Sequence, residues 1–234
     1  MASNQNPNET SNEVLDDYIK AYHDYKNNDT TKTIEFEGKI YSCKENCIAL
    51  TKEYNDKIVY YYEKCNNYNE MLNYRKDFID YLESWIQYND AAMYCVECIK
   101  LSDLMNDNTL ANLYRLRAAN LFASGKKYDM AAKHFSELAM TTQKSEYYMN
   151  AILCHIKCDI AIANASFDAA CIQHPPFSAS NEYKFVSQVL EAITKSNLDM
   201  FMNTITTYDN IKKLGAWQTS LLLSIKACIM GINN

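Results

Sequence analysis

The chain has 234 residues, a formal net charge of −6 and a content of charged residues of 22%, so it can bury one large core or two small ones. Only four glycines and three prolines occur, and no proline lies between Pro7 and Pro175. A sheet protein of this length needs more turn residues, and the acidic balance argues against wholesale nucleic-acid binding. We therefore predict an all-α fold whose helices are joined by short polar turns.

No apolar run approaches the roughly 18 residues that a membrane-spanning helix needs. The first ten residues are polar and lack the charged and apolar regions of a secretory signal. We therefore expect a cytoplasmic protein whose nine cysteines are reduced thiols that pack as small hydrophobic side chains.

The N-terminal half begins with residues 1–12, which are rich in Asn, Ser and Glu and are predicted to form a disordered tail. A first helix is predicted from Val14 to Tyr25 and a second over about 32–53. Asn55-Asp56 can cap a third helix, which ends at the polar residues 66–69, and a fourth helix follows over about 70–86.

The middle of the chain contains a repeat. Tyr88-x-x-Ala91-Ala92 recurs as Tyr128-x-x-Ala131-Ala132, 40 residues later, and Phe167-x-x-Ala170 follows after another 39. Helical hairpins of this period, with small residues where the helices cross, are typical of a tetratricopeptide-like (TPR-like) α-solenoid. We predict such a repeat region over residues 13–174, with helices at 109–124, 128–140, 145–163 and 165–173.

The sequence His174-Pro175-Pro176 is the one strong break in the chain. Helices are predicted after it at about 179–194, 198–206 and 216–229. We expect residues 175–234 to form a C-terminal helical bundle packed on the last hairpins.

Two cysteine patterns could suggest chemistry. Cys95-x-x-Cys98 lies within a predicted helix, away from the turns and second ligand pair that a zinc site favours, so core thiols are the preferred interpretation. Cys154 and His155 are neighbours on a helix and point about 100° apart, which does not suit a nucleophile and its base. We predict no catalytic site, no metal and no cofactor.

The charge is unevenly distributed. Residues 1–114 carry 11 Lys/Arg and 20 Asp/Glu, whereas residues 115–157 carry 7 and 3. Lysines scattered on solvated helix faces would explain this pattern. In a solenoid, however, matching faces form an extended surface, on which Arg115, Arg117, Lys126 and Lys127 would suit a long acidic partner.

Between Tyr114 and Ile229 a series of motifs follows in a characteristic order and spacing: Arg117-Ala-Ala, Tyr128 to Phe135, Ala151 to His155, Asp159, Pro176-Phe-Ser, Glu182-Tyr-Lys, Leu190-Glu-Ala, Tyr208 to Ile211, Trp217, Thr219, Leu221-Leu222 and Ile225-Lys226. In these motifs the stretch resembles the alpha class of soluble NSF attachment proteins (alpha-SNAP).

The resemblance implies a twisted sheet of helical hairpins followed by a helical bundle. It also implies a non-enzymatic adaptor, peripheral to endomembranes, that binds SNARE four-helix bundles laterally and recruits the hexameric ATPase NSF to dismantle them. Arg117 matches a basic SNARE-contacting position, and Arg75 and Lys76 lie one turn from another such position, held here by Leu72. Asp159 and Glu191 match acidic positions that face the ATPase.

The chain also departs from the family pattern. Thr194 and Lys195 stand where the resemblance implies two further acids, and the sequence ends at Asn234 without the family's acidic ending. The alternative hypotheses are therefore a generic helical-repeat scaffold, or a competitor that binds SNAREs without activating NSF.

Overall fold

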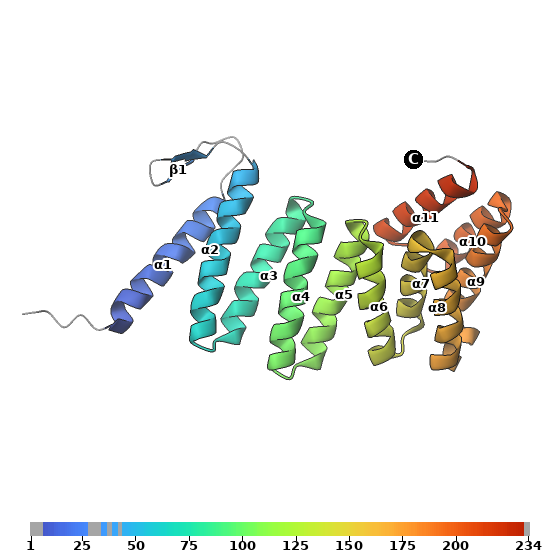
Figure 1. Ribbon diagram of the computed structural model, residues 1–234, viewed down its shortest axis with the longest axis horizontal. Helices are drawn as coiled ribbons and strands as arrows, with labels where there is room; N and C mark the ends of the chain where they lie inside the picture. Colours follow the sequence, from blue (N-terminus) through green and yellow to red (C-terminus); the bar gives the residue numbers. More distant parts are fainter. Residues whose placement is uncertain (1–6, 28–33, 37–38, 42–43, 232–234) are drawn as a thin grey trace, which may run out of the picture. The chain divides into compact units, whose positions relative to one another are not determined.

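The computed structural model describes residues 7–27, 34–36, 39–41 and 44–231 (Figure 1). The chain divides into two compact units, residues 1–108 and 109–234. The boundary falls at the start of helix α5 (Asn108–Ser124), whereas the predicted boundary between repeat region and bundle lies at 174/175. That predicted division stays a prediction.

The first unit contains α1 (Pro7–Lys26), α2 (Lys44–Lys64), α3 (Tyr68–Ser84) and α4 (Tyr88–Leu104). Consecutive helices pack against each other. The core lies between them and is unusually aromatic, with Tyr22, Tyr25 and Phe78 almost completely buried. Burying these large side chains contributes favourably to the folding of this unit. Residues 7–12, predicted as part of a disordered tail, are helical and form the start of α1.

The second predicted helix, over 32–53, is only partly correct. The structure has a two-stranded antiparallel ladder of β1 (Ile34–Phe36) and β2 (Lys39–Tyr41), with Ile34 opposite Tyr41. The runs around Ile34 and Ile40 are rich in β-branched and aromatic residues and flank Gly38, a pattern that favours a hairpin over a helix.

The predicted cap at Asn55-Asp56 is wrong, since α2 runs through both residues. The Asn55 side chain is fully buried. Its Nδ2 donates to the Tyr74 carbonyl at 2.9 Å and its Oδ1 accepts from Arg75 at 2.6 Å. The amide is therefore satisfied by α3, and the helix continues because nothing competes for its backbone hydrogen bonds.

The second unit contains α5 (Asn108–Ser124), α6 (Tyr128–Thr142), α7 (Ser145–Cys158), α8 (Ile160–Gln173), the 3₁₀ helix η1 (Pro175–Ala179), α9 (Asn181–Thr194), α10 (Leu198–Ile211) and α11 (Ala216–Ile229). The all-α, TPR-like class is confirmed, with the short β-ladder as an addition. Among the described residues, no helix is both long and apolar enough to cross a membrane.

A recurring turn explains the 40-residue repeat. Asn66, Ile86, Asn106 and Lys126 all have positive φ, at 20-residue intervals. In each turn the next residue donates its N–H five residues back, as from Lys127 to Phe122 at 2.8 Å. This is a Schellman motif, in which the left-handed residue ends one helix and lets the next begin two residues later. A helix and its turn thus take 20 residues, and a hairpin takes 40.

Small residues occupy the helix crossings, as the repeat predicted. Ala91 and Ala92 on α4 and Ala131 and Ala132 on α6 have no solvent-exposed surface. Without a larger side chain, the backbones of packed helices can approach closely.

The predicted helix 145–163 is also wrong in its boundary, because α7 and α8 are separated at Asp159. An Asp159 carboxylate oxygen accepts the N–H of Ala161 at 2.7 Å, and the backbone of Asp159 is extended. Asp159 is thus the N-cap of α8, and capping a new helix here compensates for the interruption of the old one.

The last helix, α11, is held by contacts with helices that lie far from it in the sequence. Gln218 donates to Asn150 on α7 at 2.7 Å, and both side chains are buried. Trp217 stacks on Phe135 of α6, with ring centroids 5.5 Å apart, and donates to Asn120 of α5 at 3.0 Å. These contacts orient α11 toward α5, α6 and α7.

Candidate interaction surfaces

Arg115, on α5, contributes to the packing of its hairpin. Its Nε lies 3.0 Å from a carboxylate oxygen of Glu137 on α6, and its Nη1 donates to Asn112 at 2.9 Å. Only 16% of the Arg115 side chain is exposed. The positive charge is therefore largely compensated within the hairpin.

His134 borders this ion pair from the other side. Its ring stacks on Phe122 of α5, with centroids 5.7 Å apart, and its Nδ1 is buried without a hydrogen-bond partner. Burial lowers the pKa of His134, and the nearby Glu137 carboxylate only partly opposes this shift. The neutral imidazole is therefore the form that fits this site.

Arg117 points to another side of α5. Two residues along a helix correspond to about 200° of rotation, so Arg117 and Arg115 do not share a face. Arg117 is half-buried and shares its side of the helix with Leu113 and Asn120. Lys126 and Lys127 are exposed in the turn that follows α5. The structure thus places Arg115 and Arg117 on different sides of α5, and the two lysines in the turn that follows.

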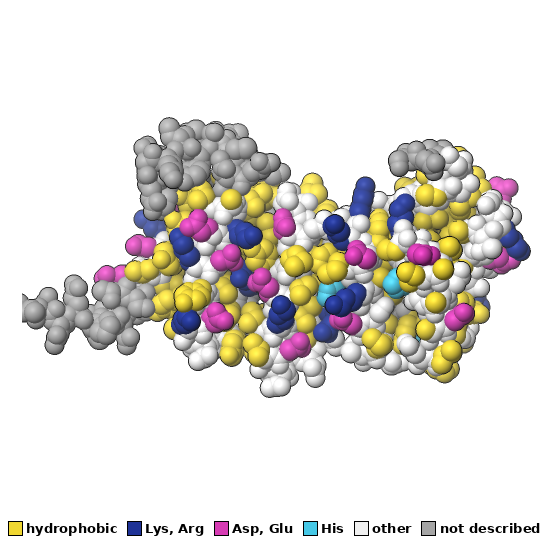
Figure 2. All heavy atoms as spheres, viewed as in Figure 1, with side chains coloured by type: hydrophobic (Ala, Val, Ile, Leu, Met, Phe, Trp, Pro, Cys, Tyr) yellow, Lys and Arg dark blue, Asp and Glu magenta, His cyan; other side chains and the backbone are white. Residues whose placement is uncertain are grey.

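On the face drawn in Figure 2, basic and acidic side chains are interspersed, and no large surface of one sign is visible. Lys133 on α6 is exposed as well, with Asp129 one turn away. The local excess of basic residues in the sequence is thus distributed over several helix faces.

Arg75 and Lys76 belong to the other unit. Arg75 is buried, with its guanidinium 2.5 Å from Asp56 and 3.0 Å from Glu97. It also lies over the ring of Tyr94, 4.8 Å from the ring centroid. Lys76, by contrast, is exposed. Arg75 therefore connects three helices of its unit, and of the two residues only Lys76 offers its charge to solvent.

The two acidic candidates are both exposed and both engaged locally. One carboxylate oxygen of Asp159 caps α8. Glu191, on α9, accepts from Lys195 at 2.6 Å in an exposed pair four residues apart. Such a surface pair contributes little to stability, but it partly neutralises the carboxylate.

The cysteine patterns lie in the core. Cys95, Cys98 and Cys154 have no exposed surface. Burial raises the pKa of the Cys154 thiol far above its usual range, which keeps the group protonated and unsuited to act as a nucleophile. Within the described residues, no three His, Cys, Asp or Glu side chains are grouped as a metal site would need.

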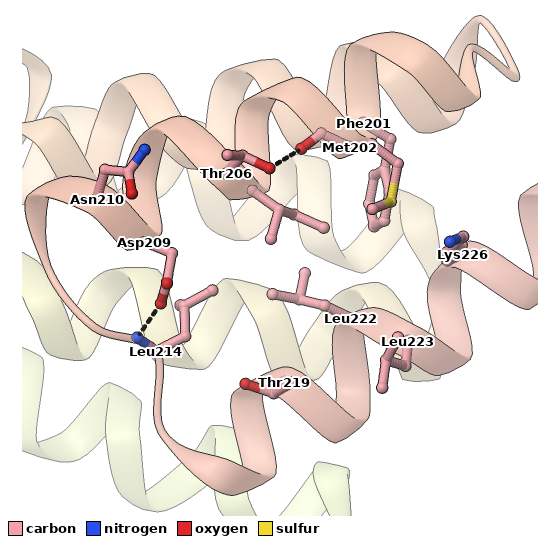
Figure 3. Close-up of a pocket in the computed structure, with 11 residues that line it drawn as sticks. Phe201, Met202, Thr206, Asp209, Asn210, Leu214, Thr219, Leu222, Leu223 and Lys226 are labelled. Carbon is pink, nitrogen blue, oxygen red and sulfur yellow. Dashed lines mark hydrogen bonds between the residues drawn. The ribbon is translucent and has the colours of Figure 1, made fainter.

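A cleft that sequence reasoning missed lies between α10 and α11 (Figure 3). It has a volume of about 280 Å³. Phe201 and Leu222 form its buried floor, and Met202 and Leu223 form exposed apolar edges on opposite helices. No sequence pattern predicted this cleft, because the position of α11 depends on the contacts of Trp217 and Gln218 with α5 to α7.

The comparison with known families covers almost the whole chain. A sequence profile of the family described as "Soluble NSF attachment protein, SNAP" matches residues 2–230. The chain belongs to the soluble NSF attachment protein (SNAP) family.

Individual SNAP relatives are distant from this chain. The probable vesicular-fusion protein sec17 homolog of Schizosaccharomyces pombe is 27% identical over 70% of this chain and 60% of its own length. The alpha-soluble NSF attachment protein of Mus musculus is 30% identical over 53% of this chain and 45% of its own length. A sec17 homolog of Neurospora crassa is 25% identical over 94% of this chain and 71% of its own length. The chain thus spans about half to two thirds of the length of most of these relatives.

Within this SNAP-family chain, the family match includes α1 and the β-ladder as well as the helices from Tyr114 onward. The resemblance found by motif spacing was strongest in the second unit. The profile shows that the first unit belongs to the same family.

Proposed function

We propose that this SNAP-family chain is a non-enzymatic adaptor that binds SNARE complexes and recruits the ATPase NSF for their disassembly in vesicle transport and membrane fusion. The observation that carries the proposal is the family match over residues 2–230. Relatives named as vesicular-fusion proteins and as NSF attachment proteins support it. The proposed place of action is the cytoplasm, at the surface of endomembranes and through the SNAREs.

For SNARE binding we propose Arg117 with Lys126 and Lys127 on the second unit and, separately, Lys76 on the first unit. Lys76, Lys126 and Lys127 are exposed, and Arg117 is half-buried. Exposed cations at the edge of an interface mainly raise the association rate with an acidic partner, and salt weakens their effect. Arg115 and Arg75, also candidates from the sequence, are proposed to act indirectly, since each holds helices together through ion pairs.

A binding measurement with an assembled, acidic SNARE bundle tests this surface. We expect binding to fall severalfold between about 50 and 500 mM salt, and the triple change Arg117→Glu, Lys126→Glu and Lys127→Glu to weaken it at low salt. Lys184→Glu, which reverses an exposed charge on α9, is the matched control. Equal loss with Lys184→Glu, or no loss with the triple variant, would argue against the proposed surface.

For the ATPase-facing side we propose Asp159 and Glu191, which are exposed on the second unit. The ion pair between Glu191 and Lys195 favours a second candidate function, that of a competitor that binds SNAREs without activating NSF. A reconstituted disassembly assay with NSF and ATP separates the two functions. Disassembly supports the adaptor, whereas SNARE binding without disassembly supports the competitor.

A Lys195→Glu variant sharpens this comparison. It removes the partner of Glu191 and adds an acid where the family resemblance implies one. If the carboxylate faces the ATPase, the variant should support faster disassembly than the unmodified chain. An unchanged rate would show that the Glu191–Lys195 pair does not limit coupling.

A further inference from the structure

The cleft between α10 and α11 combines an apolar interior with a lysine that has no acidic partner among the described residues. Ile205 and Leu214 line it together with the floor residues Phe201 and Leu222, and its apolar surface continues onto the exposed edges. Met202 is 36% exposed and Leu223 is 59% exposed. Exposed apolar groups that border a preformed cleft are typical of a site for another molecule.

The two charged residues that line the cleft differ in their contacts. Asp209 accepts the N–H of Leu214 at 2.9 Å and pairs with Lys213 at 2.7 Å. The hydrogen bond from Leu214, together with Lys213, lowers the pKa of Asp209. The side-chain Nζ of Lys226, at the end of the cleft near Phe201 and Met202 (Figure 3), makes no hydrogen bond or ion pair with any described residue. The charge of the cleft that remains available is therefore positive.

The shape of the cleft indicates what kind of molecule would fill it. It is open along one side, so an occupant keeps part of its own surface in water. A simple acyl chain would leave apolar surface exposed there, whereas an amphipathic helix would bury one face and hydrate the other. The flexible thioether of Met202 at one edge can adapt to the side chains of such a helix.

We propose that the α10–α11 cleft binds an amphipathic α-helix of a partner protein, with large apolar side chains on the docking face and an acidic residue beside it that pairs with Lys226. The apolar side chains fill the space above Phe201 and Leu222. The pairing with Lys226 fixes the direction in which the helix lies. This inference does not depend on the adaptor role, because neither SNAREs nor NSF are needed to test it.

Selection from a displayed library of 16-residue helical peptides, with the purified full chain as the target, tests the proposal. We expect enriched peptides to carry Leu, Phe or Met at positions i, i+3 or i+4, and i+7, and an excess of Asp and Glu beside that face. Leu223→Asp places a charge on the exposed edge and should weaken binding of an enriched peptide about tenfold or more, as measured by fluorescence anisotropy.

Two further variants make the experiment specific. Ile172→Asp changes an apolar residue on α8 that is 80% exposed and should leave peptide affinity within about twofold, a difference of only a few tenths of a kcal/mol. Lys226→Glu should invert the charge preference, so that peptides with Lys in place of Asp and Glu bind better than the acidic ones.

Three results would overturn the proposal. The first is that the unmodified chain enriches helical peptides no more than the Leu223→Asp variant does when that variant is the target. The second is a charge preference that Lys226→Glu does not change. The third is self-association that Leu223→Asp abolishes in sedimentation equilibrium, which would assign the cleft to a second copy of the chain.

Discussion

The residues in the hairpin turns are not equally suited to their backbone conformation. Ile86 has φ of +63° and is 70% exposed. For a β-branched side chain this conformation is unfavourable, because Cβ and its branches crowd the adjacent carbonyl. Asn66 and Asn106, in the equivalent turns, have a short polar side chain that tolerates it well.

This difference predicts that Ile86→Asn stabilises the first unit. We expect a gain of about 1 kcal/mol in the free energy of unfolding, measured from the midpoint of urea denaturation. The reverse change, Asn106→Ile, serves as the matched test and should cost a similar amount. If both variants have the midpoint of the unmodified chain, the left-handed conformation at residue 86 is not a source of strain.

Asp159 combines a structural contact with an exposed charge, and two substitutions separate them. Asp159→Asn keeps an oxygen that can accept the N–H of Ala161, so the helix cap should survive. Asp159→Ala removes the cap and should cost about 1 kcal/mol of stability.

The disassembly assay then shows whether the charge itself matters. If Asp159 faces the ATPase, both variants should slow NSF-dependent disassembly, although only Asp159→Ala lowers the melting temperature. Full activity of Asp159→Asn would limit the role of Asp159 to capping α8.

At the level of the elements, α11 is held by a buried pair of amides. Gln218 donates to Asn150, and its Oε1 accepts the N–H of Gly215 at 2.6 Å. Removal of the Gln218 side chain would leave the Asn150 amide buried with one partner fewer, which is costly in an apolar environment.

We therefore predict that Gln218→Ala destabilises the docking of α11 by about 1–3 kcal/mol. Hydrogen exchange of residues 216–229 should accelerate more than exchange in α7. Thr219→Ala, at the exposed neighbouring position, should change neither the stability of α11 docking nor the hydrogen exchange of residues 216–229. Uniform acceleration throughout the second unit would instead indicate that α11 unfolds together with the rest of the unit.

The apolar helix α8 shows why hydrophobic pattern does not suffice to orient an element. Its sequence is apolar on most sides, with Asp168 its only charged residue, yet within it only Ala163 and Ala170 are buried. Ile162 and Ile172 stay exposed. Where several faces are equally apolar, the face that becomes buried is decided by the neighbouring helix α7.

For the whole molecule, the two compact units give an expectation for acid unfolding. Burial lowers the pKa of both His134 and His155, which belong to the second unit. Near His134, Glu137 opposes this shift, and Lys133 and Arg115 add to it. A histidine with a lowered pKa binds fewer protons when folded than when unfolded. Its contribution to stability is therefore complete above the unfolded pKa of about 6.5 and falls as pH decreases below it.

We predict that the stability of the second unit decreases as the pH falls from about 6.5 to about 5.5. Trp217 lies in the second unit and Trp85 in the first, so a Trp85→Phe variant reports the second unit by fluorescence. Replacing His134 with Gln should reduce the pH dependence of its urea midpoint. If the urea midpoint of the Trp85→Phe chain, with His134 and His155 both present, stays constant over this pH range, the prediction is wrong.

The sequence by itself determined the all-α class, the 40-residue repeat with its alanine crossings and the family. These properties follow from local patterns: scarce helix breakers, residues that recur at a fixed interval, and motifs whose order is preserved. Most helix boundaries of the second unit could also be predicted, because Gly125 and His174-Pro175 mark them directly.

Only the tertiary structure decided what Asn55, Asp159 and the arginines do. A polar residue has the same local propensity whether its partner is its own backbone or a helix distant in sequence. Asn55 was therefore predicted to cap a helix, whereas in the structure its buried side chain hydrogen-bonds to α3. Arg115 and Arg117 are neighbours in the sequence, but the rotation of the helix directs the first to Glu137 and the second to another face. The cleft beside Lys226 exists because α11 is anchored on α5 to α7, a combination of contacts across nearly 100 residues that no local pattern encodes.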